Sequence, residues 1–405
     1  MRVFLWELKK IWSPWVVIAT VVITILCYLV MVRPMFSLFN LDYPGWKKTE
    51  YETAKSWLDR YGPTLEENER LDAERDYELV LEEMEAFIAS HPEFAKAGVY
   101  SLSDYQDYRA QAGTFENEED RALFDQIDEI LYFENETNLG FRYQDMPGIY
   151  WSYDNRNQPL EKNPEFPEGW YERQDALREA DGLRSVIPSS VVSDIQSVMR
   201  YAVFLPMIAV FVLIAPYPVR DRSRELTALQ WTSKTGRKVA QVQFWAALTS
   251  SFVVAAVVVA LLFLRLFMSG GAFLPFLDCP VNGFINDLYT FGGLTLGQWL
   301  VSYALLCLLF GLLSGALVFL ISQYSKSYVP MLLKQLLLFV LIVLLAYYCG
   351  SGNLLDTPLV FYPIGSAGFR TGIAGIELWC SALLFLLAAG GCLIYAFSRR
   401  RKELL

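Results

Sequence analysis

The chain has 405 residues and a formal net charge of −10, and its charges are unevenly distributed along the sequence. Residues 33–199 carry 36 Asp and Glu against 16 Lys and Arg, whereas the remainder carries 8 acidic and 18 basic residues. A hydrophobic content of 54% is high for a soluble chain with so acidic a block. The composition therefore excludes an ordinary soluble domain and predicts a membrane protein with one large polar insertion.

Several classes of protein lack the residues that they need in this chain. The only histidine is His91, which leaves zinc hydrolase motifs and imidazole-based catalytic triads without their usual groups. None of the six cysteines lies in residues 33–199, so the insertion is not a disulfide scaffold. The sequence also lacks a GxxxxGK[ST] phosphate loop. We expect no catalytic residue, no metal site, no cofactor on this chain and no nucleic-acid partner.

Six apolar stretches are long enough to cross a membrane. A spanning helix needs about 20 predominantly apolar residues, because the hydrocarbon core cannot satisfy open backbone groups. The predicted spans are residues 11–32, 201–219, 239–264, 299–321, 329–349 and 378–398. We therefore predict an all-α polytopic membrane protein with six transmembrane helices, five of which follow the insertion.

Basic residues in the short connections predict the orientation of these spans. Lys and Arg favour the cytoplasmic side of a bacterial cell membrane. They occur before span one, between spans two and three, between spans four and five, and after span six. The opposite connections have no Lys or Arg between Met268 and Trp299, and only Arg370 after span five. Both termini are therefore expected in the cytoplasm, and residues 33–199 outside the cell.

These patterns divide the chain into four regions. Residues 1–12 are a cytoplasmic amphipathic elbow and residues 13–32 are the first transmembrane helix. Residues 33–199 are the extracellular acidic domain. Residues 200–405 hold spans two to six, with a cytoplasmic loop at 218–238 and a Pro- and Gly-interrupted outer loop at 350–376.

The acidic insertion is predicted to be a folded, mainly helical domain. Its 167 residues are enough for one domain, and Trp46, Trp57 and Trp151 favour a core over a disordered acidic tail. Its carboxylate runs at 66–69, 82–85 and 116–120 could bind calcium or attract cationic peptides. None of the runs has the DxDxDG spacing of a calcium loop, which favours solvated helix faces.

Helical periodicity within the insertion predicts several segments. A capping-box pattern at Thr64 and Glu67 predicts the start of a long helix, and a second helix is expected at 117–134. Weaker helical patterns lie at 104–112 and 170–183, and residues 142–167 are expected to be irregular. The apolar residues that recur on one face of the two stronger helices are Tyr77, Leu81, Met84 and Ile88, and Leu123, Ile127 and Ile130.

The loop at 218–238 contains a short amphipathic segment. Leu226 and Leu229 have helical spacing, and a turn at Thr235 and Gly236 precedes the basic entry into span three. A plain positive-inside connection is one interpretation. A helix under the membrane that transmits a push from a soluble partner into two spans is the other.

This loop resembles that of the type-2 permeases of ATP-binding cassette (ABC) exporters. In that family a Glu shortly after span two precedes a coupling helix and a Thr-containing restart into span three. The resemblance assigns ATPase coupling to Glu225, Leu226, Leu229, Trp231, Lys234, Thr235, Gly236 and Arg237. It implies a cytosolic ABC ATPase dimer that binds ATP and Mg, and a second permease subunit, identical or paralogous. The 167-residue connection departs from most members and resembles the subgroup with large external domains.

The outer loop adds to this resemblance. Pro358, Pro363 and Gly365 interrupt it as in the family's re-entrant helices, and broken helices at membrane depth line cavities or are buried in protein. Arg265 and Glu377 lie at span edges, where they could line a pathway or extend to the interface. Cys279 and Cys349 both fall near the predicted outer surface, where they could pair or remain as thiols.

The resemblance implies a permease that exports a peptide, an antimicrobial compound or another amphipathic substrate. A membrane-anchored sensor or adaptor, whose external domain binds a ligand without transport, is the alternative. Five clustered spans favour a pathway because a sensor needs fewer spans. An intramembrane enzyme is disfavoured, since no HExxH motif or paired aspartates occur in the spans.

Overall fold

A computed structural model gives the structure of the chain. It describes residues 2–41, 45–111, 117–134, 137–154, 184–223, 239–269, 271–281, 294–325, 327–337 and 376–401, together with residues 168, 171, 172 and 176. Within these residues the fold is all-helical and has no β-strand, as predicted. Two isolated β-bridges join Thr64 to Ser185 and Pro280 to Thr295.

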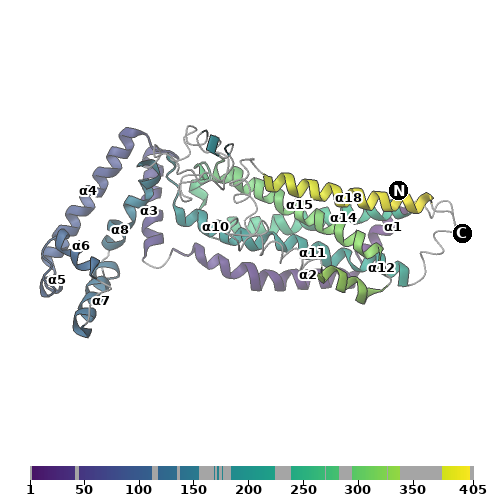
Figure 1. Cartoon of the computed structure of the whole chain (residues 1–405), viewed down its shortest axis with the longest axis horizontal. Helices are drawn as coiled ribbons and strands as arrows, with labels where there is room; N and C mark the ends of the chain where they lie inside the picture. The colour runs from purple at the N-terminus through teal and green to yellow at the C-terminus, as the bar shows by residue number, and fades with distance from the viewer. Residues whose placement is uncertain are drawn as a thin grey trace.

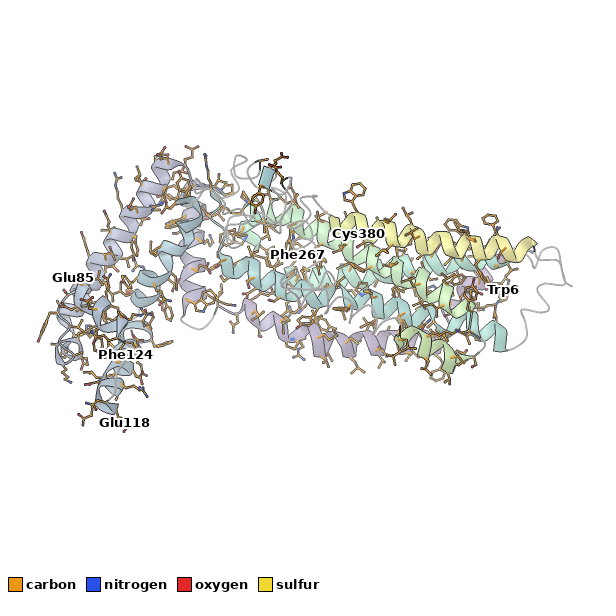
Figure 2. The ribbon with its side chains drawn as sticks, in the orientation of Figure 1. Trp6, Glu85, Glu118, Phe124, Phe267 and Cys380 are labelled. Atoms are coloured by element: carbon orange, nitrogen blue, oxygen red, sulfur yellow. The ribbon has the colours of Figure 1, made fainter. Side chains whose placement is uncertain are left out.

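The helices form two bodies along one long axis (Figure 1). A bundle of long apolar helices makes up one part, and helices α3 to α8 form a separate body beyond one end of it. The two termini lie at the other end of the bundle. We call the end of the bundle next to α3–α8 the insertion end, and the end where the two termini lie the termini end. The side chains in Figure 2 follow this division, with Glu85 and Glu118 in the separate body and Trp6 near the termini end.

Five described helices are long and apolar enough to cross a membrane. They are Pro14–Phe39, Ser189–Asp221, Val239–Phe267, Leu296–Gln323 and Trp379–Ser398. They correspond to predicted spans one, two, three, four and six. Predicted span five, residues 329–349, is described only over residues 329–337, which are helical. The remainder of that span lies outside the described residues.

The first apolar helix is preceded by a short one and changes its winding along its length. Helix α1 covers Arg2–Ile11, and α2 begins at Pro14, where the missing N–H of proline costs no helical bond. The elements that follow are a π-helical turn, η1, at Tyr28–Val32 and a 3₁₀ helix, η2, at Arg33–Phe39. Much of α2 is exposed, so it lies at the edge of the bundle.

The second apolar helix lies at the centre of the bundle. It is built from α10 (Ser189–Ala202), α11 (Phe204–Ile214) and α12 (Pro216–Ser223). Pro206 and Pro216 lie near the joints and each removes one helical hydrogen bond, which accounts for the breaks at Val203 and Ala215. Helix α11 packs against α2, α14 (Val239–Phe267) and α15 (Leu296–Gln323).

Small residues let α15 approach its neighbours closely. A Cβ on Gly311 would lie 2.7 Å from the Cβ of Ala255, and one on Gly315 would lie 2.2 Å from Ser251 Oγ. Helix α18 (Ile376–Arg401) packs against the same helix. Residues 311–315 thus form a GxxxG contact of the kind that joins helices where no hydrophobic force is available between them.

Hydroxyl groups on α15 donate to backbone carbonyls of the second apolar helix at three levels. Tyr303 donates to the carbonyl of Met199. The Ser314 hydroxyl donates to the carbonyl of Met207 at 3.1 Å, and the Ser322 hydroxyl to that of Ala215 at 3.3 Å. Donors and acceptors rise together in number, so the two helices run parallel.

The separate body contains six described helices. They are α3 (Trp46–Tyr61), α4 (Glu67–Ser90), α5 (Pro92–Lys96), α6 (Leu102–Ala110), α7 (Glu118–Tyr132) and α8 (Leu139–Asp154). Trp57, Met84, Ile88 and Ile127 are buried within it as predicted, whereas Trp46 is 46% exposed and lies outside the core. Helix α7 confirms the helix predicted at 117–134, and α6 covers most of the weaker one at 104–112. Most of residues 170–183 lie outside the described residues.

The capping box predicted at Thr64 and Glu67 is wrong by two residues. Glu66 is the N-cap of α4, and its backbone N–H donates to Glu69 Oε2 at 2.7 Å. The cause is a long-range contact: Leu65 N–H donates to the carbonyl of Arg184 at 2.8 Å. This pairing keeps the backbone extended up to Glu66, so α4 begins two residues later than predicted.

The irregular structure predicted for 142–167 is wrong over its first part, because α8 continues to Asp154. Pro147 lies inside this helix and removes the bond that the carbonyl of Tyr143 would accept. The hydroxyl of Tyr77 in α4 donates to that carbonyl at 3.1 Å instead. Burial of Phe141 and Met146 further holds the helix in place. Residues 155–167 lie outside the described residues.

Candidate functional site

Helix α1 buries a polar group on the face that it turns to the bundle. Glu7 and Ile11 are buried there, although Leu5 and Trp6 on other faces are exposed. The helix packs against α14. A carboxylate that is only 4% exposed must be paired or hydrogen-bonded, since burying an unpaired charge is costly. The position of Glu7 therefore indicates a built polar contact.

That contact is a cluster of five side chains, which we call the polar clamp: Glu7, Lys10, Tyr217, Asp221 and Gln243. Lys10 Nζ lies 2.9 Å from Glu7 Oε1 and 3.0 Å from Asp221 Oδ2. Gln243 Nε2 donates to Asp221 Oδ2 at 3.2 Å, and the Tyr217 hydroxyl donates to Glu7. The clamp thus joins α1 to the last turn of the second apolar helix and the first turns of the third.

Lys10 is the cation at the centre of the clamp. Burial favours the neutral amine, but the hydrogen bonds and charges of Glu7 and Asp221 outweigh it and raise the pKa of Lys10 above its ordinary value of 10.5. The ammonium group therefore stays charged at physiological pH. Its charge balances one of the two carboxylate charges of Glu7 and Asp221, which are 4% and 5% exposed.

Two further hydrogen bonds fasten α1 beside the clamp. Arg220 Nη2 donates to the backbone carbonyl of Lys10 at 2.5 Å, which satisfies one of the carbonyls left open at the end of α1. The indole of Trp12 donates to Ser250 Oγ at 3.0 Å on α14. The N-terminal helix is consequently tied to both neighbouring helices at side-chain and backbone level.

The predicted ATPase-coupling residues lie in sequence between Asp221 of α12 and Gln243 of α14, which the clamp joins. All eight of them, from Glu225 to Arg237, lie outside the described residues. Two residues lie between Asp221 and the undescribed segment 224–238, and four lie between that segment and Gln243. The segment is therefore adjacent in sequence to the clamp on both sides.

The sequence held partial signals for the clamp. Glu7 is the one acidic residue in an otherwise basic and apolar N-terminal segment, and Asp221 lies between Arg220 and Arg222 in a basic loop. An acidic residue against the local charge pattern can mark a paired site. Nothing in the sequence indicates that these two residues meet.

Of the other predicted site residues, Arg265 lies at the opposite end of α14 from Gln243 of the clamp. Arg265 is exposed near the end of α14, and its guanidinium lies 4.9 Å from the ring centre of Phe36 in a cation–π contact. Glu377 lies in the first turn of α18. Pro358, Pro363 and Gly365 lie outside the described residues. Cys279 is a buried free thiol, and Cys349 is also outside them.

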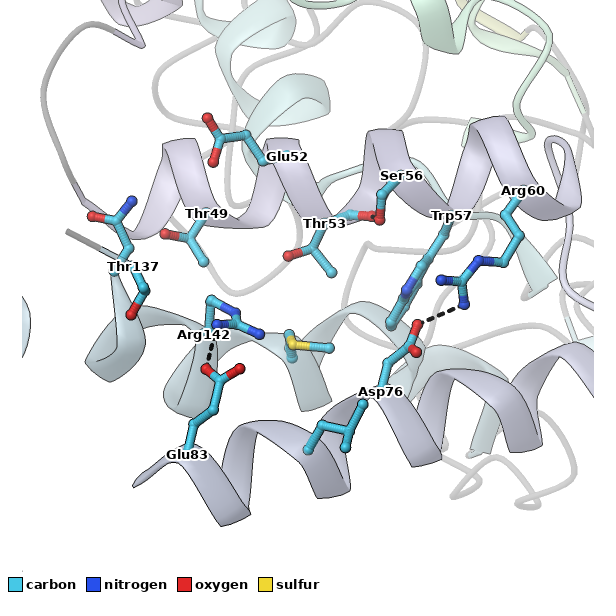
Figure 3. Close-up of a pocket in the computed structure, with 13 residues that line it drawn as sticks. Thr49, Glu52, Thr53, Ser56, Trp57, Arg60, Asp76, Glu83, Thr137 and Arg142 are labelled. Carbon is cyan, nitrogen blue, oxygen red and sulfur yellow. Dashed lines mark hydrogen bonds and ion pairs between the residues drawn. The ribbon is translucent and has the colours of Figure 1, made fainter. Parts of the chain in front are cut away.

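The separate body contains an open groove of 340 Å³ between α3, α4 and α8 (Figure 3). Hydroxyl groups of Thr49, Thr53 and Ser56 line the α3 side. Two ion pairs lie across it: Arg60 Nη1 to Asp76 Oδ2 at 2.8 Å, and Arg142 Nη1 to Glu83 Oε2 at 2.7 Å. The lining of the groove is mixed, since Trp57, Leu79 and Met146 also contribute to it, and its two arginines are neutralised.

Several described carboxylates of the acidic runs have structural roles. Glu85 accepts a bond from the backbone N–H of Leu102 at 2.6 Å, and Glu118 and Glu119 lie in the first turn of α7, where acidic groups favour the helix dipole. Among the described residues, no group of three His, Cys, Asp or Glu could hold a metal ion.

Comparisons with family models, with curated proteins and with solved structures find no match to this chain. Function is therefore inferred from the geometry of the polar clamp and the groove and from the sequence pattern around them.

Proposed function

We propose that the chain is the membrane-spanning permease subunit of an ABC transporter, coupling ATP hydrolysis by a separate ATPase to export of a peptide or another amphipathic substrate. The observation that carries the proposal is the polar clamp. It connects an amphipathic N-terminal helix to two apolar helices that flank the loop resembling an ABC coupling helix.

The clamp supports this function because it would make α1, α12 and α14 move together when an ATPase moves the loop between α12 and α14. An ATPase dimer that closes on the loop at 224–238 would displace the ends of α12 and α14 together, and α1 with them. Such a push changes the balance between two pathway states only if the ATPase binds them with different affinity. A second permease subunit would complete the pathway, with both termini in the cytoplasm and residues 33–199 outside the cell.

The groove between α3, α4 and α8 favours a second candidate, a membrane-anchored sensor or adaptor. Its hydroxyl and charged lining could hold a polar ligand, and signalling would need no transport. Five apolar helices with closely packed small residues favour the transporter, since anchoring alone needs fewer.

The test is ATP-dependent transport by the reconstituted complex. The chain would be affinity-purified from its native membrane, any P-loop ATPase recovered in fixed stoichiometry identified, and the pair placed in proteoliposomes. Glu225→Ala and Arg237→Ala are expected to abolish stimulation of ATP hydrolysis or transport, while Lys96→Ala, an exposed change in α5, leaves both intact.

Wild-type transport by both loop variants would overturn the coupling assignment. Recovery of the chain without any ATPase under gentle detergent conditions, together with ligand binding by the groove, would support the sensor instead.

A further inference from the structure

Helix α3 of the separate body caps the central apolar helix across a large sequence distance. Helix α10 begins after Pro188, which offers no side-chain cap. Glu50 of α3 takes that role: its Oε1 accepts bonds from the Ser189 backbone N–H and hydroxyl, each at 2.8 Å. Its Oε2 accepts a bond from the Ser190 N–H at 3.3 Å. Glu50 is only 7% exposed, and a carboxylate at a helix N-terminus is favoured by the helix dipole.

A second contact lies one turn away on each helix. Lys47 Nζ lies 2.7 Å from Asp194 Oδ1, and Asp194 is 7% exposed. Lys47 and Glu50 are three positions apart, so they project from the same face of α3. We call Lys47, Glu50, Ser189, Ser190 and Asp194 the latch. With two points of attachment, α3 is held against α10 in position and in rotation.

The same helix forms one wall of the groove. Thr49, Thr53 and Ser56 line it from α3, while Leu79 and Glu83 line it from α4 and Met146 from α8. Figure 3 shows α3 running along the groove opposite α4. One ion pair in the groove, Arg60 to Asp76, joins α3 directly to α4, and its side chains are 53% and 30% exposed, whereas the pair of Arg142 and Glu83 joins α8 to α4. Exposed pairs contribute less than contacts with a buried carboxylate such as Glu50. Direct contact between α3 and α4 is therefore slight, and α8 packs against both of these helices.

The polar clamp holds the opposite end of the helix that the latch holds. Residues Ser189–Asp221 run from Glu50 and Lys47 at the insertion end to Glu7 and Lys10 at the termini end (Figure 1). The bundle places no flexible loop between the two attachments, since the described residues 189–223 are helical apart from Val203 and Ala215.

We infer that the width of the groove and the state of the polar clamp are conformationally coupled, through α3, the latch and the central apolar helix. A change at the clamp tilts this helix and carries α3 with it, which opens or closes the groove. By linkage, a ligand that favours one width of the groove biases the clamp by the same free energy. The inference holds for a transporter or a sensor.

The experiment measures the groove directly in the full-length chain. Spin labels at Ser56→Cys and Leu79→Cys, on opposite walls, would be placed in a variant with Cys27, Cys349 and Cys380 replaced by Ser. Distances would be measured by pulsed electron paramagnetic resonance in lipid nanodiscs. Two clamp variants, Asp221→Asn and Lys10→Met, each test the coupling, so failure of one to fold leaves the other.

The expected result is a shifted distance distribution in the clamp variants, and loss of that shift when Lys47→Ala and Glu50→Ala are added. The matched control is Lys55→Ala with Asp59→Ala, which removes an exposed 2.6 Å ion pair of α3 and should preserve the shift. An unchanged distribution in the folded clamp variants, or a shift that persists without the latch, overturns the inference. The measurement uses no ATPase and no substrate, so its failure is distinct from failure of the proposed function.

Discussion

Lys10 Nζ and Asp221 Oδ2 lie 3.0 Å apart although 211 positions separate the two residues in sequence. The contact brings the beginning of the chain to the end of the central apolar helix, across the whole acidic insertion. Because Asp221 also accepts a bond from Gln243, the same carboxylate reaches the third apolar helix. One buried side chain thereby links three elements that would otherwise meet only through apolar packing.

Lys10→Met is expected to destabilise the protein. The variant leaves Glu7 and Asp221 buried without their cation, and breaking a buried pair costs about 3 kcal/mol, reduced here because Lys10 is partly exposed. We expect a lower thermal unfolding midpoint in detergent and partial release of α1, measured by faster amide hydrogen exchange over residues 2–11.

Lys9→Met is the control for this change. Lys9 has the same chemistry but is exposed, and it contacts only the ring of Trp6 at 5.5 Å in the geometry that the structure gives. Equal destabilisation by the two variants would show that the loss of a positive charge near the membrane, rather than the clamp, is responsible.

Gly315→Ala is expected to disrupt packing between α15 and α14. The added Cβ would lie 2.2 Å from Ser251 Oγ and 2.7 Å from Ser251 Cβ, which no side-chain rotation relieves. Overpacking of this kind costs about 1–3 kcal/mol. Thermal unfolding of the purified protein should show the loss, and Ser251→Gly in the same chain should restore part of it.

Gly390→Ala serves as the comparison, because a Cβ at that position of α18 meets nothing within 4 Å. It should be neutral or slightly stabilising, since alanine is the better helix former. A Gly315→Ala protein as stable as the Gly390→Ala protein would refute the close approach of the two helices.

Asp145→Asn is expected to stabilise the protein at pH 8 more than at pH 5. Burial, with a smaller effect from the charge of Glu50, raises the pKa of Asp145 from 3.8 to about 6, and its Oδ2 has no hydrogen-bond partner. A raised pKa means that ionisation is unfavourable in the folded state, so stability falls as pH rises from 3.8 through 6. Asparagine removes this penalty, with a gain of about 1 kcal/mol after allowance for solvent screening.

The measurement is the thermal midpoint of the full chain at the two pH values. Asp125→Asn, which neutralises an exposed carboxylate on α7, provides the reference. A gain for Asp145→Asn that is equal at pH 5 and pH 8 would contradict the pKa shift.

The orientation in the membrane can be tested with single cysteines. Lys96→Cys in α5 and Arg2→Cys in α1 lie at exposed positions of the insertion end and the termini end. In a background with Cys27, Cys349 and Cys380 as Ser, a membrane-impermeant maleimide should label Lys96→Cys on intact cells and Arg2→Cys only after lysis. The reverse pattern would place the acidic body in the cytoplasm.

The apolar helices could be predicted from the sequence because their length follows from the membrane itself. The span predicted at 239–264 is observed as Val239–Phe267, and that at 299–321 as Leu296–Gln323. The helix at 117–134 was also predictable, since Asn117 caps it and Ile127 faces the core. In each case a periodic or apolar pattern is contained within one segment.

The remaining features depend on contacts between distant segments. The latch needs Glu50 to meet Ser189, and the first turn of α4 is delayed by pairing of Leu65 with Arg184. Helix α8 passes through Pro147 because Tyr77 satisfies the carbonyl that the proline leaves open. The close packing of α15 is different, because Gly311 and Gly315 form a GxxxG pattern within one segment and could be recognised from the sequence.

The three hydroxyl bonds from Tyr303, Ser314 and Ser322 restrict how the central helix can move. A slide of one helical turn along α15 would displace every acceptor by about 5.4 Å and break all three bonds at once. A tilt about the middle bond, at Ser314 and Met207, keeps that bond and displaces only the outer two acceptors. The hydrogen bonds to α15 therefore oppose sliding of the second apolar helix along its axis more strongly than tilting about its middle.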